Sequence, residues 1–296
     1  MRAEEARKTA MPYAHPDALV STEWLARHLD APDLRIVDGT FTLPGVTPTA
    51  PQLYRERHIR GAVFFDIDDI ADDKSPLPHM LPSPEKFAQR MRKLGLGDGH
   101  RIVIYDSAGL SSAARPWWML RVFGHQDVAI LDGGLPKWQA EGRPVTDDVP
   151  APRERHFTAR LNTLLVRDKA QLLENLKTGR EQVLDARSSG RFAGTAKEPR
   201  EGLRGGHIPG SLNLPFDALT DARTRTLLPA ETLEQRFTAA GLERGKPVVT
   251  SCGSGVTACA LAFGLHLIGW PDAAVYDGSW SEWGLPGDTP VETGPR

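Results

Sequence analysis

The stretch from residue 247 to residue 259 reads Pro247-Val248-Val249-Thr250-Ser251-Cys252-Gly253-Ser254-Gly255-Val256-Thr257-Ala258-Cys259. The β-branched run before Cys252 is typical of a strand, the small residues after it of a tight loop, and the apolar residues after Thr257 of a helix. Backbone N–H groups of such a loop, with the N-terminus of the helix, can point at negative charge. The stretch therefore predicts a strand, an anion-binding loop that favours a thiolate, and a helix.

Four short phrases of the chain occur twice, in the same order and with offsets of 145 to 149 residues. The pairs are Ile36-Val37-Asp38 with Val183-Leu184-Asp185, His58-Ile59-Arg60-Gly61 with His207-Ile208-Pro209-Gly210, Ile102-Val103-Ile104-Tyr105-Asp106 with Val248-Val249-Thr250-Ser251-Cys252, and Ile130-Leu131-Asp132-Gly133 with Val275-Tyr276-Asp277-Gly278. A common order with a nearly constant offset predicts two copies of one domain. The alignment places Asp106 opposite Cys252, so only the second copy carries the thiol.

Within each copy, β-branched runs alternate with helical patterns, which cover residues 21–29, 84–94, 115–123, 169–176, 230–240 and 257–268. This alternation predicts an α/β fold, with a mainly parallel sheet flanked by helices in each copy. In an open parallel sheet the ligand crevice lies outside the carboxyl ends of the strands, where the Cys252 loop falls. We expect a flexible tail over residues 1–14, an inactive domain over 15–144, an extended linker over 145–164 and a catalytic domain over 165–296.

The composition excludes several classes of protein. The chain has 296 residues, 40% of them hydrophobic and 25% charged, and a formal net charge of −2. These values are typical of a soluble globular protein, and they show no excess of positive charge of the kind that binds a nucleic acid. The longest apolar stretch, residues 258–270, is too short to span a membrane. The charged N-terminus has no apolar core of a signal peptide, so we expect a cytoplasmic protein.

The two cysteines lie seven positions apart, Cys252 in the loop and Cys259 in the helix. Two helical turns separate their Cα atoms by about 10 Å, which is too far for a disulfide without rearrangement. We expect Cys259 to be a core residue, and a redox role for it stays open. A metal site is poorly supported, because the cysteines are not a C-x-x-C pair and the nine histidines are scattered.

The doubled domain and the phrases Gly206-His207-Ile208-Pro209-Gly210 and Tyr276-Asp277-Gly278-Ser279-Trp280-Ser281-Glu282-Trp283 resemble the two-domain rhodanese superfamily. The resemblance runs from about His15 to Pro286. Within it, the loop 252–258 is similar to the 3-mercaptopyruvate sulfurtransferase form, because the thiosulfate form carries Arg and Lys where this chain has Gly253 and Ser254. The resemblance implies two tandem rhodanese-like domains, with the active site in the C-terminal copy at the cleft between them.

The resemblance also implies the reaction. Cys252 would attack the sulfur of 3-mercaptopyruvate, release pyruvate and carry a persulfide, which a thiol such as thioredoxin, a small thiol or cyanide would accept. Backbone groups of the loop, at Gly253, Gly255, Val256 and Thr257, would bind the substrate and the outer sulfur. No metal or other cofactor is implied, and two fused copies suggest a monomer.

Two further groups of side chains come from the resemblance. Arg191 and Arg200 would clamp the carboxylate and ketone oxygens of the keto acid, because an Arg fork binds a carboxylate through two bonds. Ser254, His79 and Asp68 match the positions of a proposed proton relay, in which a neutral histidine passes a proton and a carboxylate fixes its tautomer. The alternative for His79 is a loop residue hydrogen-bonded at the domain interface.

Other classes remain to be weighed against this one. A cysteine phosphatase needs an Arg closing the loop six residues after the cysteine, where this chain has Ala258. A sulfur carrier without donor turnover would be favoured by the loss of either arginine, and both are present. Thiosulfate:cyanide sulfurtransferase (rhodanese) activity is the alternative among enzymes. The residues repeated in both copies are expected to be structural, and the tryptophans to be packing residues: His58, His207, Asp132, Asp277, Trp117, Trp118, Trp138, Trp280 and Trp283.

Overall fold

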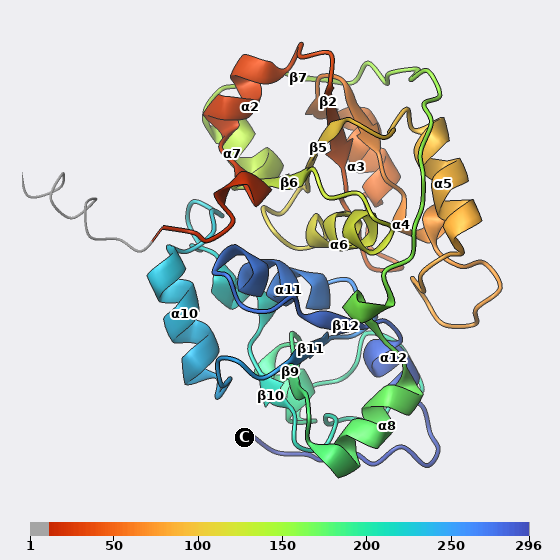
Figure 1. Ribbon diagram of the computed structural model, residues 1–296, viewed down its shortest axis with the longest axis vertical. Coiled ribbons are helices and arrows are strands. Elements are labelled where there is room, and N and C mark those ends of the chain that lie inside the picture. Colours follow the sequence, from red (N-terminus) through yellow and green to blue (C-terminus); the bar gives the residue numbers. More distant parts are fainter. Residues whose placement is uncertain (1–11, 296) are drawn as a thin grey trace, which may run out of the picture.

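The computed structural model describes residues 12–295, which form two domains in succession along the chain (Figure 1). Each domain contains a five-stranded sheet whose pairings are all parallel. The first sheet has the order β1 (Leu19–Val20), β6 (Val128–Leu131), β5 (Arg101–Tyr105), β2 (Leu34–Asp38) and β4 (Ala62–Phe64). The second has the order β8 (Val166–Arg167), β12 (Ala274–Tyr276), β11 (Val248–Ser251), β9 (Gln182–Asp185) and β10 (Leu212–Asn213). The two orders correspond strand by strand, which confirms the predicted duplication and fold class.

The register of the central strands matches as well. Asp38 of β2 lies opposite Tyr105 of β5, and Asp185 of β9 lies opposite Ser251 of β11. Asp106 and Cys252 are therefore each the first residue after the middle strand of their sheet. Because parallel strands end at one edge, this position opens into the crevice beyond the carboxyl ends.

Helices flank both sheets, and several of them begin at a side-chain cap. The first domain has α2 (Thr22–His28), α3 (Ala50–Glu56), α4 (Ile67–Ile70), α5 (Pro84–Lys93), α6 (Ala114–Val122) and α7 (Gly134–Ala140). The second has α8 (Lys169–Thr178), α9 (Ser189–Phe192), α10 (Ala230–Ala239), α11 (Ala258–Leu267) and α12 (Ser279–Trp283). The side chains of Ser21, Ser83 and Asp168 accept backbone N–H groups of the first turns of α2, α5 and α8. No helix of residues 12–295 is long and apolar enough to cross a bilayer.

The helices α6 and α11 pack against each other at the junction of the two domains (Figure 1). Nine of the ten residues of α11 are buried, because the sheet of its own domain covers one side and α6 covers the other. The ring of Trp117 meets the edge of Phe263 with 4.9 Å between centroids. One apolar cluster thus continues from the core of the first domain into the second.

Residues 145–164 run along the first domain before they reach the second (Figure 1). At the start of this predicted linker, β7 (Val145–Thr146) pairs antiparallel with β3 (His58–Ile59). Further along, the N–H of Asp98 donates to the carbonyl of His156, and Asp98 accepts the N–H of Thr158. The segment is extended, as expected, but it is bound to the first domain.

The predicted tail meets the second domain at its end. The Tyr13 hydroxyl donates to the carbonyl of Leu228, and the Ala14 N–H to that of Leu267. The tail before residue 12 lies outside the described residues. The domain limits themselves stay a prediction.

Candidate active site

A cavity of about 270 Å³ lies between the two domains beside the Cys252 loop. The first domain contributes Phe41, Leu43 and Ser111 to its wall, and the second contributes Ala186, Arg187, Ser188, Arg191, Pro199, Arg200, Phe216, Cys252, Gly253, Ser254, Val256 and Thr257. Cys252 is only 2% exposed, yet it borders this cavity. The cavity is therefore a route between the domains by which a small molecule reaches the sulfur.

Residues at the start of α12 hold the cysteine loop through hydrogen bonds. The N–H of Cys252 donates to Oγ of Ser279, and the carbonyl of Cys252 accepts the N–H of Trp280. The N–H and the hydroxyl of Ser281 both donate to the carbonyl of Gly253, at 2.8 and 2.7 Å. These bonds fix the first two peptide groups of the loop, so their orientation does not depend on a ligand.

The corresponding loop of the first domain shows what its amides can bind. The Asp106 carboxylate accepts five backbone N–H groups at 2.7 to 2.9 Å. The donors are Ala108, Gly109, Ser111, Ser112 and Ala113. Successive amides that converge in this way form a site for an anion. In the first domain this anion is the carboxylate of Asp106.

The same amides of the second domain have no such partner. Among residues 12–295, no hydrogen bond uses the N–H groups of residues 254 to 258, and the N–H of Cys259 donates to the carbonyl of Val256. Gly255 has a φ of +76°, as Gly109 has one of +110° at the matching position. A Cβ at Gly255 would lie 2.8 Å from the carbonyl oxygen of Asp277, so a glycine is required there. The Cys252 loop is an anion site that is open where the first domain's is filled.

Arg191 lies over the loop in a fixed orientation. Its Nη2 is 2.5 Å from Oε2 of Glu198, a carboxylate that is almost fully buried. Arg187 binds the other oxygen of Glu198 at 2.8 Å and is itself held by both oxygens of Asp185. A Cβ at Gly253 would come within 2.9 Å of Arg191 Nη2, so the glycine lets the guanidinium approach the loop.

Arg200 lines the same cavity and is not paired with a carboxylate. Within the described part of the chain it forms no ion pair, and its Nη2 lies 3.0 Å from Nε2 of His79. Burial, and less strongly Arg191, lower the pKa of Arg200 from its usual value, against the opposite effect of Cys252. The guanidinium lines the cavity that Cys252 borders, where an anionic group of a ligand can bind it.

His79 is buried on a loop with a φ of +62°, and it connects Arg200 to Asp68. Its Nδ1 lies 2.9 Å from Oδ1 of Asp68, and its Nε2 faces Arg200. This arrangement fits the tautomer with the proton on Nδ1, since the guanidinium has only donors. The hydrogen-bonding contact with His79 lowers the pKa of Asp68 despite partial burial.

Ser254 borders the cavity but is not joined to the other two members of the predicted relay. Its side chain is 6% exposed, and no hydrogen bond of residues 12–295 connects its hydroxyl to His79. The structure thus brings His79 and Asp68 together and places Arg200 where the relay would place the serine. The relay through Ser254 stays a prediction.

The residues expected to be structural lie where packing requires them. His58 and His207 are buried and bonded to the carbonyls of Tyr54 and Phe192, at 2.7 and 2.8 Å. Cys259 is fully buried, its thiol donates to the carbonyl of Gly255, and burial raises its pKa. The five tryptophans expected to be packing residues are at most 1% exposed.

Several contacts around the site were not predicted from the sequence. Glu198 orients Arg191, Arg187 orients Glu198, and Arg115 and Asp277 form a buried ion pair between the domains at 2.8 Å. Arg115 and Asp277 are 162 residues apart, so no local pattern could join them. The only signal for Glu198 was its place directly before Pro199 and Arg200.

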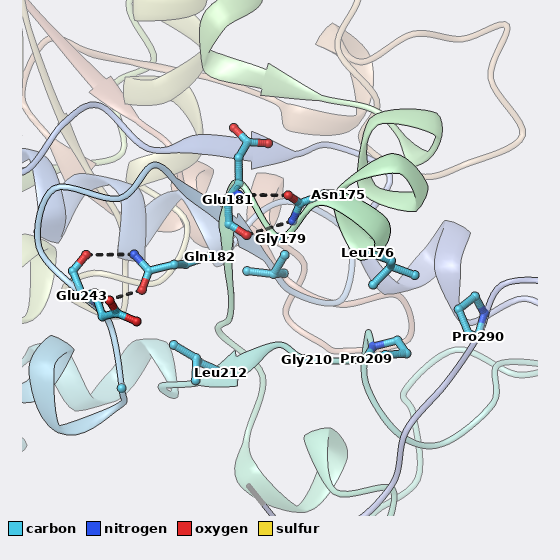
Figure 2. A pocket seen from close by; sticks show the side chains of 12 residues that line it. Asn175, Leu176, Gly179, Glu181, Gln182, Pro209, Gly210, Leu212, Glu243 and Pro290 are labelled. Atoms are coloured by element: carbon cyan, nitrogen blue, oxygen red, sulfur yellow. Dashed lines mark hydrogen bonds between the residues drawn. The ribbon is translucent and has the colours of Figure 1, made fainter.

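A second hollow, of about 500 Å³, lies at the opposite edge of the second sheet (Figure 2). It is lined by residues at the start of β9, among them Glu181 and Gln182, and by Glu243. Figure 2 shows that polar groups here are already paired: Asn175 with the backbone of Glu181, and Gln182 with the backbone of Glu243. A similar hollow of about 320 Å³ borders the start of β2 in the first domain, so both are features of the repeated fold.

The Rhodanese-like domain family matches residues 21–141 and 168–285 of the chain, one copy in each domain. The chain therefore belongs to the rhodanese family, in its two-domain form. The crystal structure of the Escherichia coli 3-mercaptopyruvate sulfotransferase SseA superposes with a TM-score of 0.81 at 40% identity. It covers 90% of this chain and 99% of that one.

The named relatives are sulfurtransferases, and this chain is an enzyme of that kind. The 3-mercaptopyruvate sulfurtransferase of Homo sapiens is 43% identical over 272 residues, which cover 90% of this chain and 91% of that protein. The thiosulfate sulfurtransferase of Bos taurus is 44% identical over 274 residues, covering 90% and 91%. Because identity to both kinds is alike, overall similarity does not distinguish the two sulfur donors.

Proposed function

We propose that the chain transfers sulfur from 3-mercaptopyruvate to a thiol or cyanide acceptor through a persulfide on Cys252, with release of pyruvate. The observation that carries the proposal is the contrast between the two repeats. Five amides surround the Asp106 carboxylate in the first domain, and the matching loop of the second domain has open amides beside a thiol. A cysteine there can carry an anionic outer sulfur where the other copy carries an anionic carboxylate.

The first half of the reaction forms an S–S bond and breaks a C–S bond. The Cys252 thiolate attacks the sulfur of mercaptopyruvate, and the electrons of the C–S bond pass to carbon as the enolate of pyruvate. The proton from the donor's thiol ends on that carbon, which gives pyruvate and the enzyme persulfide. In the second half, an acceptor thiolate or cyanide attacks the outer sulfur, and Cys252 leaves as a thiolate. Two such half reactions predict ping-pong kinetics.

The choice of donor rests on where the positive charge lies. The loop carries no basic side chain directly after Cys252, and the cations at the cavity, Arg191 and Arg200, come from segments outside the loop, with Arg187 held by Asp185 and Glu198. Such a placement suits a keto acid whose carboxylate is at the far end from its sulfur. Thiosulfate transfer is the second candidate, favoured by the similarity to the Bos taurus enzyme.

The test compares both donors on one preparation. Pyruvate release from 3-mercaptopyruvate is measured against thiocyanate formation from thiosulfate and cyanide, and mass spectrometry locates the persulfide after incubation with the donor alone. We expect a preference for 3-mercaptopyruvate, and a Cys252→Ser variant that folds but neither turns over nor carries sulfur. Cys259→Ser is the matched control and should keep the persulfide. A clear preference for thiosulfate, or a persulfide at another residue, would contradict the proposal.

The acceptor, the oligomeric state and the location of the protein belong to the same proposal. Thioredoxin, a small thiol or cyanide could each reach the sulfur through the cavity between the domains. The chain supplies both walls of that cavity itself, which supports an active monomer. We keep the cytoplasm as the proposed location, and a related Arabidopsis thaliana sulfurtransferase is named as mitochondrial. Acceptor kinetics, sedimentation and cell fractionation test these points in turn.

A further inference from the structure

Arg115 is a fully buried arginine that neither the proposed chemistry nor the substrate clamp uses. It lies on α6 of the first domain, and its guanidinium stacks over the Trp118 ring at 4.6 Å. Nη1 donates to Oδ1 of Asp277 at 2.8 Å and to the carbonyl of Gly255 at 3.3 Å. Nη2 donates to the carbonyl of His79. One side chain therefore binds the cysteine loop, the His79 loop and the strand end after β12.

Asp277 completes the connection from the other side. Its second oxygen accepts the N–H of Leu81, two residues after His79, at 2.7 Å. The ion pair thus holds the His79 loop at two points, one on either side of residue 80. His79 has a positive φ, a conformation that a non-glycine residue keeps only when its surroundings hold it.

The repeat shows which part of this arrangement the fold itself requires. Asp132 of the first domain is equivalent to Asp277. It accepts the N–H of Leu227 of the second domain, which is equivalent to Leu81. Arg225 stands where His79 stands and has the same left-handed backbone, with a φ of +60°.

The arginine has no counterpart in that second arrangement, because Leu261 occupies the position of Arg115. An aspartate therefore binds the backbone of a loop in both equivalent arrangements, Asp277 with Leu81 and Asp132 with Leu227. A guanidinium joins this contact only in the arrangement that contains the Cys252 and His79 loops. The fold makes this contact without an arginine, so the presence of Arg115 points to a task beyond holding the loop.

We propose that Arg115 is a positioning residue, whose fork sets the Cys252 loop against the His79 loop for sulfur transfer. The proposal rests on the proposed function. Through Gly255 it holds the loop that carries Cys252, and through His79 it holds the group bound to Arg200. A guanidinium can donate to separate acceptors from two nitrogens in a fixed plane, whereas a lysine ammonium is a single point of charge. Small misplacements of reacting groups cost up to about a hundredfold in rate.

The discriminating variant is Arg115→Lys. It keeps a positive charge for Asp277, so a purely structural role predicts a folded enzyme with unchanged kcat. A positioning role predicts a folded enzyme whose kcat falls by about tenfold to a hundredfold, with KM nearly unchanged because Arg191 and Arg200 still bind the donor. The matched control is Asp132→Asn at the equivalent carboxylate of the first domain, which should leave kcat as it is.

A second variant covers the case in which the lysine does not fold. Arg115→Met with Asp277→Leu removes both charges, and replacing a complete buried ion pair with apolar residues is often tolerated. The double variant should fold and show the same loss of kcat. Wild-type kcat in whichever variant folds would overturn the proposal, and so would an equal loss of kcat in the Asp132→Asn control.

Wild-type turnover tests the proposed function separately. Should the wild-type enzyme release no pyruvate, the decisive measurement becomes the rate at which iodoacetamide alkylates Cys252, mapped by mass spectrometry, because it needs no donor. The positioning role predicts slower alkylation in the folded Arg115→Lys variant, since the loop would no longer be held in the conformation that favours the thiolate. An unchanged alkylation rate would then overturn the positioning role.

Discussion

The Nη2 atom of Arg200 lies 3.0 Å from Nε2 of His79, so a cation of the cavity and the buried histidine share one hydrogen bond. His79 is bound on its other side by Asp68, at 2.9 Å. The other N–H groups of the guanidinium remain for the carboxylate of a sulfur donor. The proposed clamp and the proposed relay therefore adjoin at this contact.

The first prediction concerns Arg200→Ala. Hydrogen bonds to charged groups contribute about 1.5–3 kcal/mol each, so we expect kcat/KM for 3-mercaptopyruvate to fall by about tenfold to a hundredfold. Transfer from thiosulfate to cyanide should fall much less, because that donor has no distant carboxylate. Steady-state kinetics with both donors measure the difference, with the exposed Arg223→Ala as a matched control. Equal losses for the two donors would place the clamp elsewhere.

The second prediction concerns the relay. Proton transfer by a positioned side chain contributes typically about 100-fold or more to a rate, so His79→Ala should lower the rate of pyruvate formation by about that factor. Ser254→Ala should also lower it if the serine completes the relay once a donor is bound. Single-turnover measurements separate this step from release. A Ser254→Ala variant with the wild-type rate would leave His79 and Asp68 acting through Arg200 instead.

The third prediction concerns the stability of the first domain. Asp106→Asn replaces one acceptor oxygen by an amide, which faces at least two of the five backbone N–H groups now bound there. Leaving buried donors unpaired costs about 1–3 kcal/mol each, so the free energy of unfolding should fall by at least about 2 kcal/mol. Urea denaturation measures it. Cys252→Ser, the matched change in the second domain, should leave stability nearly unchanged; similar losses for both would be contrary to the contrast between the loops.

The fourth prediction concerns pH. Burial raises the pKa of Asp132 to about 6, against the opposite effect of the Leu227 N–H. Because this acid is harder to ionise in the folded state, its contribution to stability is present below about pH 4 and is lost as the pH rises through about 6. Asp132→Asn should remove that loss, so its stability relative to wild type should increase between pH 4 and 7, by at most about 3 kcal/mol. A constant difference across this range would show that Asp132 ionises normally.

The sequence sufficed for the fold because its signals are local or repeated. The helix predicted over residues 257–268 is α11, Ala258–Leu267, and the one over 84–94 is α5, Pro84–Lys93. The offsets between repeated phrases predicted two sheets, whose strand orders correspond. Periodicity reports which residues are buried along one element, and this information is contained in a few neighbouring positions.

The site was predictable only in part, because its geometry joins distant segments. The residues themselves singled out Cys252, and the resemblance added Arg200, which borders the same cavity, and the pair of His79 with Asp68. It did not anticipate that Arg200 would take the Nε2 of His79, since that contact spans 121 residues and depends on how the domains dock. The role of Arg115 was hidden for the same reason.

The open amides of the Cys252 loop offer the outer sulfur of the proposed persulfide hydrogen bonds that only the native state provides. These bonds would raise the free energy of unfolding, while the self-filled loop of the first domain gains nothing. We expect the persulfide form of the enzyme to have a higher melting temperature than the form without it, and to resist proteolysis longer. The difference should be absent in Cys252→Ser. The fraction of the enzyme that resists digestion in a crude extract would then measure the fraction that carries the persulfide.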